Sequence, residues 1–441
     1  MSRYFHIATM GCQMNEYDSD RVSQLLLDYG FLPTGHRDSA DLIMINTCTV
    51  REKAQQKAFS LLGRLAPLKK KRPDMILGVM GCIAQQEGHD LIKRFPEIDL
   101  VLGTREICRI QEFLERIETK QEKVVAAEIT EKPTYLIGQN GYFKGRVKGF
   151  ISIMEGCNNF CSYCIVPYVR GREVSRSPQD ILNEAENLVQ QGVKEITLLG
   201  QNVNSYSSKD EREVRFPELL RMLSSLDGLA RIRFTTSHPK DLSDELIGCF
   251  GSIKTLCPHI HLPFQAGSNR ILKLMNRGYT RELYMEKIKS LRDIRHDIAV
   301  TSDVMVGFPQ ETDDDFRMTL DLISKIEFDN LYSFKYSDRR GTAAQKMEEK
   351  IDEGEKSSRL AELQEVQKSI TLKKNRMLEG RELEILVEGD SRRGGQVTGR
   401  TITNKVVNFT CDNIILGDIV KVIIEHAFVN SLMGVTVVSE H

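Results

Sequence analysis

The chain has 441 residues, of which 40% are hydrophobic and 28% are charged, and its formal net charge is −1. This composition predicts about three globular domains, and the balanced charge means that any RNA contact has to come from local patches. No apolar run approaches the ~20 residues that cross a bilayer, and residues 1–10 lack the pattern of a signal peptide, so we expect a cytoplasmic protein without a membrane segment.

From Tyr4 to about Ile117 the sequence alternates between strand-like and helix-like runs, which is typical of a parallel sheet with helices on its faces. The expected strands are Tyr4–Thr9, Leu42–Ile45, Met75–Met80 and Leu100–Leu102, and the expected helices are Asp18–Tyr29, Glu52–Leu65 and Glu87–Phe95. Each of the first three strands runs directly into a cysteine, namely Cys12, Cys48 and Cys82. Because the carboxyl ends of parallel strands lie on one edge of a sheet, these cysteines can converge in space.

A second alternating segment runs from Val147 to about Ser337. Its strand candidates are Val147–Met154, Glu195–Leu199, Arg231–Thr235, His259–Leu262, Ala299–Val306 and Tyr332–Tyr336. Helices fit between them, at Pro178–Gln191, Pro217–Leu226, Arg281–Arg295 and Asp313–Lys325. Six such units predict a partial (β/α)6 barrel rather than the eight units of a closed TIM barrel.

The last part of the chain changes character twice. The stretch Lys346–Leu378 is helical and polar with mixed charges, and we expect a solvated connecting helix. From Arg381 to Val438, short alternating strands between Gly and Asn turns predict a small β-barrel or sandwich. Residues 118–142 lack periodicity and are expected to form a linker, so the predicted domains are 1–117, 143–375 and 376–441.

Ten cysteines in a chain expected in a reducing compartment indicate metal binding or catalysis rather than a disulfide framework. Cys157, Cys161 and Cys164 have CxxxCxxC spacing and follow the first strand of the second domain, at the edge where barrels place active sites. Three thiolates can hold three irons of a 4Fe-4S cluster and leave the fourth open to chelate a substrate. Structural zinc wants four ligands, so zinc and unrelated core cysteines are the less favoured alternatives.

This motif, with Tyr163 before its last cysteine, resembles the signature of radical S-adenosylmethionine (SAM) enzymes. The run from Cys157 to Arg176, CNNFCSYCIVPYVRGREVSR, is similar to the methylthiotransferase family within them. The resemblance extends over the whole chain through the further motifs GCQMNEYDSD, NTCTVREKAQQK, GCIAQ, ITLLGQNVNSY, TTSHPKDL, HLPFQAGSNRILKLM and VGFPQET.

The resemblance implies two 4Fe-4S clusters with three cysteine ligands each. The first domain would be a flavodoxin-like sheet that holds one cluster on Cys12, Cys48 and Cys82. The second would bind SAM at the open iron of the cluster on Cys157, Cys161 and Cys164. Beside Tyr163, the expected cofactor contacts are Gln201, Asn202, Asp303, Gly307 and Glu311. Gln201 and Asn202 replace the Gly-Glu pair of many such enzymes, and an amide can still accept a hydrogen bond from the methionine ammonium. The family usually has Gly where this chain has Gln310.

The third domain resembles the TRAM module, a small β-barrel associated with tRNA binding. The stretch Ser391–Lys405 contains four cations and no acid, so we expect salt-sensitive phosphate contacts from Arg392, Arg393, Arg400 and Lys405. The similar run Lys69–Arg72 is interpreted as a solvated helix end.

The Gln13–Asn15 and Val50–Glu52 motifs resemble the branch that acts on isopentenyl (dimethylallyl) adenosine beside the tRNA anticodon. The resemblance implies that a radical made from SAM activates carbon 2 of the adenine, and that sulfur from the Cys12, Cys48 and Cys82 cluster is methylated by a second SAM. The implied partners are tRNA carrying isopentenyl-adenosine and an electron donor such as flavodoxin or ferredoxin, with the chain a monomer. The alternatives are activity on threonylcarbamoyl-adenosine or on a ribosomal-protein aspartate, and a non-enzymatic iron–sulfur RNA-binding protein.

Overall fold

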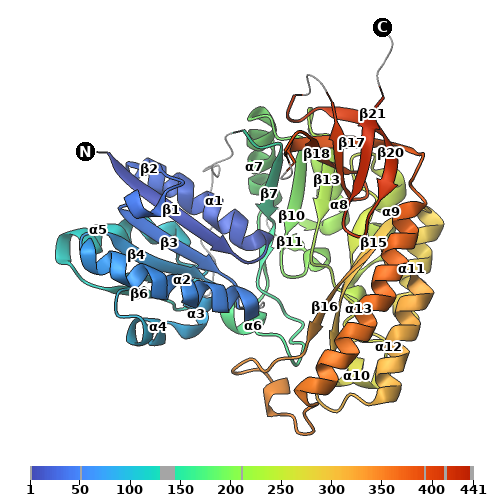
Figure 1. The fold of residues 1–441 in the computed structure, drawn as a ribbon, viewed down its shortest axis with the longest axis horizontal. Helices are drawn as coiled ribbons and strands as arrows, with labels where there is room; N and C mark the ends of the chain where they lie inside the picture. Colours follow the sequence, from blue (N-terminus) through green and yellow to red (C-terminus); the bar gives the residue numbers. More distant parts are fainter. Residues whose placement is uncertain are drawn as a thin grey trace.

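The computed structural model describes residues 2–49, 52–129, 145–209, 212–391, 394–411 and 415–437. Figure 1 shows an N-terminal sheet domain in blue, a central barrel in green to orange, and a small C-terminal barrel in red beside the central one. Over the described residues, no helix has both the length and the apolar character that a membrane span requires.

The N-terminal domain is one parallel sheet with the strand order β2-β1-β3-β4-β5-β6. Its strands are β1 (Arg3–Met10), β2 (Phe31–Pro33), β3 (Leu42–Thr47), β4 (Ile76–Gly81), β5 (Leu100–Leu102) and β6 (Val124–Ala126). The helices are α1 (Gln13–Asp28), α2 (Glu52–Lys71), α3 (Cys82–Glu87), α4 (His89–Arg94) and α5 (Ile110–Lys120). Alternate residues of β3 serve two cores, with Leu42 and Met44 toward α1 and α5, and Ile43 and Ile45 toward α2 and α3. This order is the flavodoxin-like one, so that prediction is confirmed.

Three features of this domain differ from the sequence prediction. Strand β6 lies inside the range expected to be linker, where Val124–Ala126 pairs in parallel with β5. The helix expected over Glu87–Phe95 is broken at Gly88, which has φ +48° and separates α3 from α4. Three-residue strands such as β2 and β6 are too short to show a periodic pattern. Most of the remaining expected linker, residues 130–142, lies outside the described residues, and the domain limits themselves stay predictions.

The central domain is a partial barrel of six parallel strands in two halves, β13-β10-β7 and β14-β15-β16. The strands are β7 (Lys148–Ser152), β10 (Glu195–Leu199), β13 (Arg231–Phe234), β14 (His259–His261), β15 (Ala299–Val306) and β16 (Asn330–Lys335). A parallel bridge between Ile232 and Leu256 joins the halves. The covering helices are α7 (Pro178–Gln190), α8 (Phe216–Ser224), α9 (Asp244–Ser252), α10 (Asn269–Leu274), α11 (Arg281–Ile294) and α12 (Asp313–Ile326). The predicted partial barrel is confirmed.

Smaller elements complete this domain. They are β8 (Met154–Glu155) paired with β9 (Val174–Ser175), the short helix α6 (Val166–Val169), and the hairpin β11 (Ser207–Lys209) with β12 (Glu213–Arg215). The turn from β8 into α6 carries Cys157, Cys161 and Cys164, so it forms the rim of the barrel's carboxyl edge.

The long helix α13 (Glu353–Arg376) is not a fully solvated connector. Every fourth residue from Arg359 through Leu363, Gln367 and Thr371 to Asn375 is buried, which gives the helix one inward face. The buried polar groups find backbone partners, since Gln367 Nε2 donates to Phe328 O over 2.9 Å. A polar face that is buried through hydrogen bonds looks solvated in the sequence, which is why the prediction was wrong.

The C-terminal barrel is closed, with the strand order β17-β18-β19-β21-β20. Its strands are β17 (Glu382–Asp390), β18 (Val397–Thr401), β19 (Val406–Thr410), β20 (Ile419–Ala427) and β21 (Leu432–Thr436). Arg231 and Arg233, at the start of β13, donate four hydrogen bonds of 2.8 to 3.3 Å to backbone carbonyls of this barrel. The small barrel therefore docks at the amino end of the central strands, opposite the edge that carries the cysteines.

Candidate functional site

The register of the N-terminal sheet brings the first three cysteines together. Met10 of β1 pairs with Thr47 of β3, and Thr47 pairs with Gly81 of β4. Cys48 and Cys82 directly follow these paired residues, and Cys12 follows Met10 by two positions. The predicted convergence is observed, because the Cys48 thiol is hydrogen-bonded to both Cys12 and Cys82. Cys12 and Cys48 flank the β1–β3 crevice, where flavodoxin-like sheets place their ligands. We call these residues the first triad.

One glycine and two asparagines hold the first triad in place. Gly81 has φ +92°, and a Cβ there would lie 2.6 Å from Asn46 Oδ1 and 2.7 Å from Thr47 O, so only glycine fits. Asn15 Nδ2 donates to Asn46 Oδ1 over 2.8 Å, and Asn46 Nδ2 donates back to Asn15 O over 2.8 Å. Asn15 Oδ1 also accepts from the Cys12 amide over 3.1 Å and lies 3.3 Å from its Sγ. Both asparagines are fully buried, so this pair links α1 to β3 beneath the cysteines.

Two cysteines of the first triad, Cys12 and Cys82, favour the thiolate form. The hydrogen bond from Cys48 lowers the pKa of Cys12 to about 6, against the opposing effect of burial. The same hydrogen bond from Cys48 lowers the pKa of Cys82 to about 7. The pKa of Cys48 is raised, because its thiol donates these bonds and stays protonated. Thiolates are the form of cysteine that binds soft metals, so this set suits iron.

The second triad, Cys157, Cys161 and Cys164, lies on the turn after β8. Gly156 has φ +82°, and its amide donates to Gln201 Oε1 over 2.6 Å. The Cys157 amide donates to Gly171 O over 3.2 Å, which closes the turn. Burial raises the pKa of Cys157 and raises that of Cys164 to about 12, so here the thiolate form needs a nearby cation or metal.

A buried arginine supplies such a cation. Arg277 is 5% exposed, and its Nη1 lies 3.3 Å from Cys161 Sγ and 3.5 Å from the Tyr163 hydroxyl. Its Nη2 donates to Pro263 O over 2.8 Å, and its Nε donates to the Tyr279 hydroxyl over 3.3 Å. Tyr163 is therefore placed at the second triad as predicted, with its hydroxyl turned to Arg277.

Unsatisfied buried polar atoms gather at the strand ends next to the second triad. Asn202 Oδ1 follows β10, and Ser237 Oγ and His238 Nε2 follow β13; none of the three has a hydrogen-bond partner in the described part of the chain. Burial lowers the pKa of His238 to about 2, and its Nδ1 accepts from the Lys240 amide, so Nε2 carries a proton to donate. The His238 donor, the Asn202 acceptor and the Ser237 hydroxyl are thus available to hydrogen-bond a polar ligand.

The ligand atoms of the two triads are of the kinds that the predicted 4Fe-4S clusters and SAM require. Each triad offers three sulfur ligands, and the second adds unsatisfied polar atoms that suit the amino-acid part of SAM. Over the described residues, no three Cys, His, Asp or Glu side chains have the arrangement that a single metal ion requires.

The other expected SAM contacts divide into two kinds. Asn202 keeps a free acceptor, whereas the Gln201 oxygen is occupied by the Gly156 amide. Asp303 is 30% exposed and lies 3.5 Å from His261 Nε2, so it remains open to a ligand.

Glu311 and Gly307 are bonded to the protein instead. The Glu311 carboxylate is 1% exposed and accepts from the Gly307 amide over 2.7 Å and from Arg359 over 2.8 Å. A Cβ on Gly307 would collide with the side chain of Lys356 rather than with a ligand. Both residues shape the loop before α12, and their expected contact with the cofactor stays a prediction.

Arg170 connects the two triads. It follows α6, six positions after Cys164, and is hydrogen-bonded to the Cys82 side chain of the first triad. Its guanidinium, 5% exposed, donates to Asp18 Oδ2 over 3.0 Å and to Glu155 Oε1 over 3.3 Å. This ion network joins the N-terminal domain to the central barrel directly behind the cysteines. The sequence analysis missed Arg170 and Arg277, although Arg170 lies inside a quoted motif.

Two of the four expected RNA-binding cations of the C-terminal barrel are described, and both are paired with acids. Lys405 Nζ lies 3.3 Å from Asp329 Oδ1 and donates to Asn375 Oδ1 over 2.8 Å, which fastens the small barrel to the central domain. Arg400 Nε pairs with Glu388 over 3.3 Å, and its carbonyl accepts from Arg231. The Lys405 side chain thus acts in domain docking, whereas the Arg400 side chain pairs within its own barrel, and the RNA contacts expected of both residues stay predictions. Arg392 and Arg393 lie outside the described residues.

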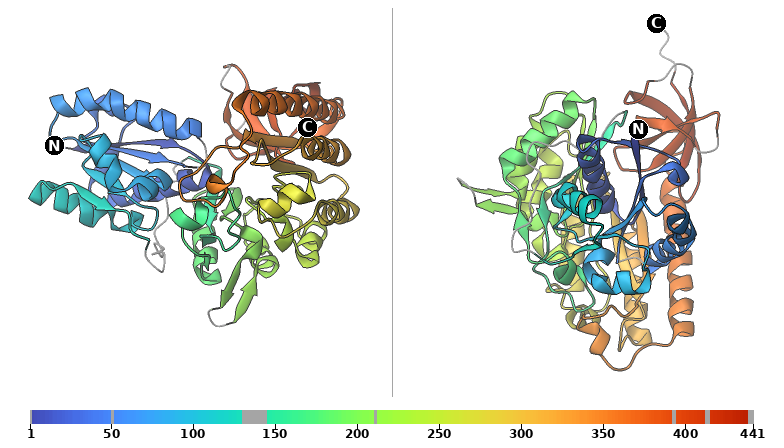
Figure 2. Two further views of the ribbon diagram at one scale, coloured as in Figure 1. Left: turned by 90° about the horizontal axis from the view of Figure 1, so that it is seen from below. Right: turned by 90° about the vertical axis from the view of Figure 1, so that its left-hand side faces the viewer.

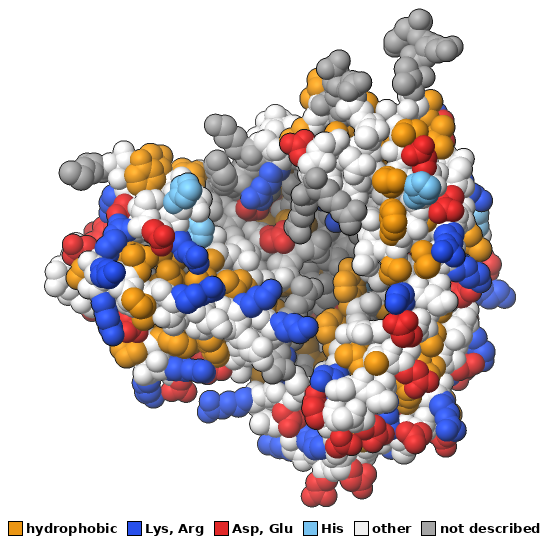
Figure 3. All heavy atoms as spheres, viewed as in Figure 1, with side chains coloured by type: hydrophobic (Ala, Val, Ile, Leu, Met, Phe, Trp, Pro, Cys, Tyr) orange, Lys and Arg blue, Asp and Glu red, His pale blue; other side chains and the backbone are white. Residues whose placement is uncertain are grey.

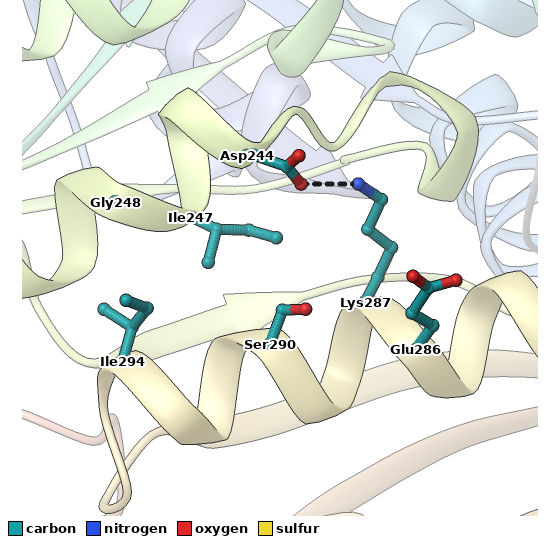
Figure 4. Close-up of a pocket in the computed structure, with 7 residues that line it drawn as sticks. All are labelled: Asp244, Ile247, Gly248, Glu286, Lys287, Ser290 and Ile294. Atoms are coloured by element: carbon teal, nitrogen blue, oxygen red, sulfur yellow. Dashed lines mark hydrogen bonds and ion pairs between the residues drawn. The ribbon is translucent and has the colours of Figure 1, made fainter.

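A surface pocket between α9 and α11 lies on the outside of the barrel, away from both triads (Figure 4). It is lined by residues such as Ile247 and Ile294, and the Lys287–Asp244 ion pair of 2.8 Å spans it. It contains no thiol, so it belongs to the packing of two helices rather than to the candidate site.

Comparisons with known proteins agree with this architecture. Residues 4–103 match the model of Uncharacterized protein family UPF0004, residues 151–323 that of the Radical SAM superfamily, and residues 376–437 that of the TRAM domain.

Similar curated proteins cover nearly the whole chain. A tRNA-2-methylthio-N(6)-dimethylallyladenosine synthase of Syntrophus aciditrophicus (strain SB) is 51% identical over 98% of this chain and 94% of its own. A second tRNA-2-methylthio-N(6)-dimethylallyladenosine synthase, of Syntrophobacter fumaroxidans (strain DSM 10017 / MPOB), is 49% identical over 98% of this chain and 95% of its own.

Among solved structures, this chain is similar to the radical S-adenosylmethionine methyltransferase TsrM of Kitasatospora setae, which was solved with cobalamin and a [4Fe-4S] cluster bound. The TM-score between the two structures is 0.56. TsrM is 16% identical and covers 78% of this chain and 74% of its own, so the likeness is one of fold. The fold class predicted for the three domains is confirmed.

Proposed function

The chain belongs to the family of tRNA-2-methylthio-N(6)-dimethylallyladenosine synthases, and from this premise we propose that it adds a methylthio group to carbon 2 of dimethylallyl-adenosine in tRNA, beside the anticodon. It is a radical SAM enzyme whose cofactors are 4Fe-4S clusters and SAM. The observation that carries the proposal is the pairing of two cysteine triads, each on a carboxyl edge, across one domain junction.

We propose that the first triad holds one 4Fe-4S cluster and the second triad another. Once bound, these clusters and SAM supply the radical chemistry, the sulfur and the methyl group. The donor chemistry supports this set, because three thiolates per cluster leave one iron for an exogenous ligand. The alternative of a four-ligand structural zinc finds no support, since neither motif offers a fourth residue.

The side chains around the second triad then have defined tasks. Asn202 Oδ1 would accept from the ammonium group of SAM, and His238 Nε2 and Ser237 Oγ would bind its polar atoms, because all three are buried without a partner in the described part of the chain. Gln201 acts indirectly, because it fixes the turn that carries Cys157. Arg277 donates to Cys161 Sγ and to the Tyr163 hydroxyl, so it holds both side chains at the site.

The partners follow from this reaction. The substrate is tRNA carrying isopentenyl-adenosine, and a one-electron donor such as flavodoxin or ferredoxin reduces the second-triad cluster. The target base has to leave its stack, which costs least for an unpaired anticodon-loop base. We propose that the chain works as a monomer in the cytoplasm, where such tRNA is modified.

Two cysteine variants test the assignment of the triads. Cys161→Ala should abolish the release of 5′-deoxyadenosine from SAM in reduced protein. Cys48→Ala should retain this release but form no methylthio product. Cys257→Ala, a buried barrel cysteine outside both triads, is the matched control and should retain both. Normal 5′-deoxyadenosine release by Cys161→Ala would contradict the assignment of the second triad to the cluster that cleaves SAM.

A further inference from the structure

Helix α2 carries a row of cations on its solvent face. Its sequence contains one acid, Glu52, and six cations. Positions 53, 57, 60, 64, 67 and 71 recur at alternating steps of four and three, which places them on one face of a helix, and all six are exposed. Four of these positions are cationic: Lys53, Lys57, Arg64 and Lys71. We call these four residues the cationic stripe.

The cationic stripe has no counter-ion within the described part of the chain. None of its four side chains has an ion-pair or hydrogen-bond partner among the residues that the structure describes. The neighbouring cations differ, because Lys69 pairs with Asp99 over 2.7 Å and Arg72 pairs with Asp41 over 2.8 Å. Cations with a structural task in this region are therefore paired, and the stripe is left free for an external anion.

The cationic stripe begins close in sequence to the first triad. It begins five residues after Cys48 and, at 1.5 Å per residue, extends about 27 Å along the helix. Both views of Figure 2 place α2 on the same face of the molecule as α13 and the C-terminal barrel. Figure 3 shows this face hollowed between the N-terminal domain and the two barrels, with Lys and Arg side chains leading across the N-terminal domain to the hollow.

We propose that the cationic stripe binds the phosphate backbone of the substrate RNA; this inference rests on the proposed function. A straight row of four unpaired cations suits a linear polyanion better than a compact single anion. An RNA that delivers a base to the first triad has to pass the hollow, where the stripe starts. Of the described cations expected to bind RNA in the C-terminal barrel, Arg400 pairs with Glu388 and Lys405 pairs with Asp329, so both differ from the stripe.

Binding of a fluorescently labelled anticodon stem-loop RNA carrying isopentenyl-adenosine tests the proposal. The variant K53Q/K57Q/R64Q/K71Q should bind about tenfold more weakly at low salt, and the slope of log affinity against log salt should fall by about 3 in magnitude. The control K209Q/K254Q/K273Q/K289Q removes four other exposed cations without an ion-pair partner among the described residues, and it should bind like the unmodified chain.

The possible outcomes separate the competing explanations. Equal RNA affinity of both variants would overturn the proposal. Unchanged RNA affinity with slower reduction by an acidic one-electron donor protein, but not by dithionite, would instead make the stripe a donor-docking surface. Retained 5′-deoxyadenosine release in dithionite shows that the clusters are intact. If the unmodified chain forms no methylthio product, but only the stripe variant loses RNA affinity, the proposed function fails while this inference stands.

Discussion

Arg277 and Arg170 each bring a guanidinium against one cysteine triad. Arg277 Nη1 lies 3.3 Å from Cys161 Sγ, and Arg170 is hydrogen-bonded to the Cys82 side chain. Both arginines are buried and hydrogen-bonded to groups that fix their orientation. Hydrogen bonds to cluster sulfurs and nearby charge are among the factors that set the reduction potential of an iron–sulfur cluster. These arginines therefore act as positioning residues beside the proposed ligands.

Replacing Arg277 with Gln should lower the midpoint potential of the second-triad cluster. The change removes a positive hydrogen-bond donor that favours the reduced, more negative cluster. Redox titration followed by electron paramagnetic resonance measures the shift, with the first-triad signal as an internal control. The matched variant Arg170→Gln should shift the first-triad signal instead, and identical shifts of both signals in each variant would contradict this account.

His259 should make the folded state sensitive to acid. It is 9% exposed, and burial lowers its pKa to about 3, below the ordinary value of 6.5. The unfolded chain therefore binds the extra proton first, and stability is lost as the pH falls from about 6.5 toward 3. Between pH 7 and pH 5 the chain should lose about 2 kcal/mol more stability than His259→Gln in urea unfolding. Parallel losses in both proteins would show that His259 titrates normally.

At the scale of elements, the loop between β15 and α12 contains a strained residue. Gln310 has φ +69°, the left-handed conformation that favours glycine, and the family resemblance expects Gly there. Its backbone is nevertheless fixed, because its amide donates to Glu349 O over 2.9 Å. The loop thus keeps its shape at a cost to stability.

Gln310→Gly should stabilise the protein by about 1 kcal/mol, because glycine adopts a positive φ without the steric penalty of a Cβ. Urea unfolding of the two proteins measures the difference. The control Gly307→Ala, at φ +70° in the same loop, should destabilise the protein because its Cβ would also collide with Lys356. A loss of stability in Gln310→Gly would show that the Gln310 side chain makes a compensating contact.

The sequence predicted long elements better than short ones. Strands β10 and β15 occur over the expected residues because their apolar runs are long and bounded by turns. Strands β2 and β6 were missed because each buries a single residue, whereas the equally short β5 is buried throughout and was predicted. The buried face of α13 was missed because its residues are mostly polar. The convergence of Cys12, Cys48 and Cys82 was predictable because each follows a parallel strand, and the carboxyl ends of parallel strands lie on one edge of a sheet. Arg277 could not be predicted in this way, since its contact with Cys161 joins residues 116 positions apart.

At the scale of the whole molecule, charged contacts hold the three domains together. Arg170 ties the N-terminal domain to the central barrel, and Arg231 and Arg233 tie the central barrel to the C-terminal one. The second contact lies at the amino end of the central strands, so the C-terminal barrel is anchored away from the cysteines. Its orientation relative to the hollow is fixed by side chains donating to backbone carbonyls.

Replacing both Arg231 and Arg233 with Ala should loosen the C-terminal barrel without disturbing the triads. Hydrogen exchange of the β18 amides should accelerate as their opening free energy falls by about 2 kcal/mol or more, because hydrogen bonds from charged donors are lost. Arg221→Ala, which removes an exposed ion pair on α8, is the control and should leave this exchange unchanged. Unaltered protection in the double variant would mean that other contacts hold the barrel.

Nucleoside mass spectrometry tests the central claim most directly. Reduced protein with both clusters assembled would be incubated with SAM and tRNA carrying isopentenyl-adenosine. The account predicts a new 2-methylthio-isopentenyl-adenosine peak that requires both triads. Two outcomes would contradict the assigned substrate. In the first, 5′-deoxyadenosine is released without this product. In the second, a methylthio product forms only on threonylcarbamoyl-adenosine tRNA or on a ribosomal-protein aspartate. Absence of both products from fully loaded protein would contradict the enzymatic function itself.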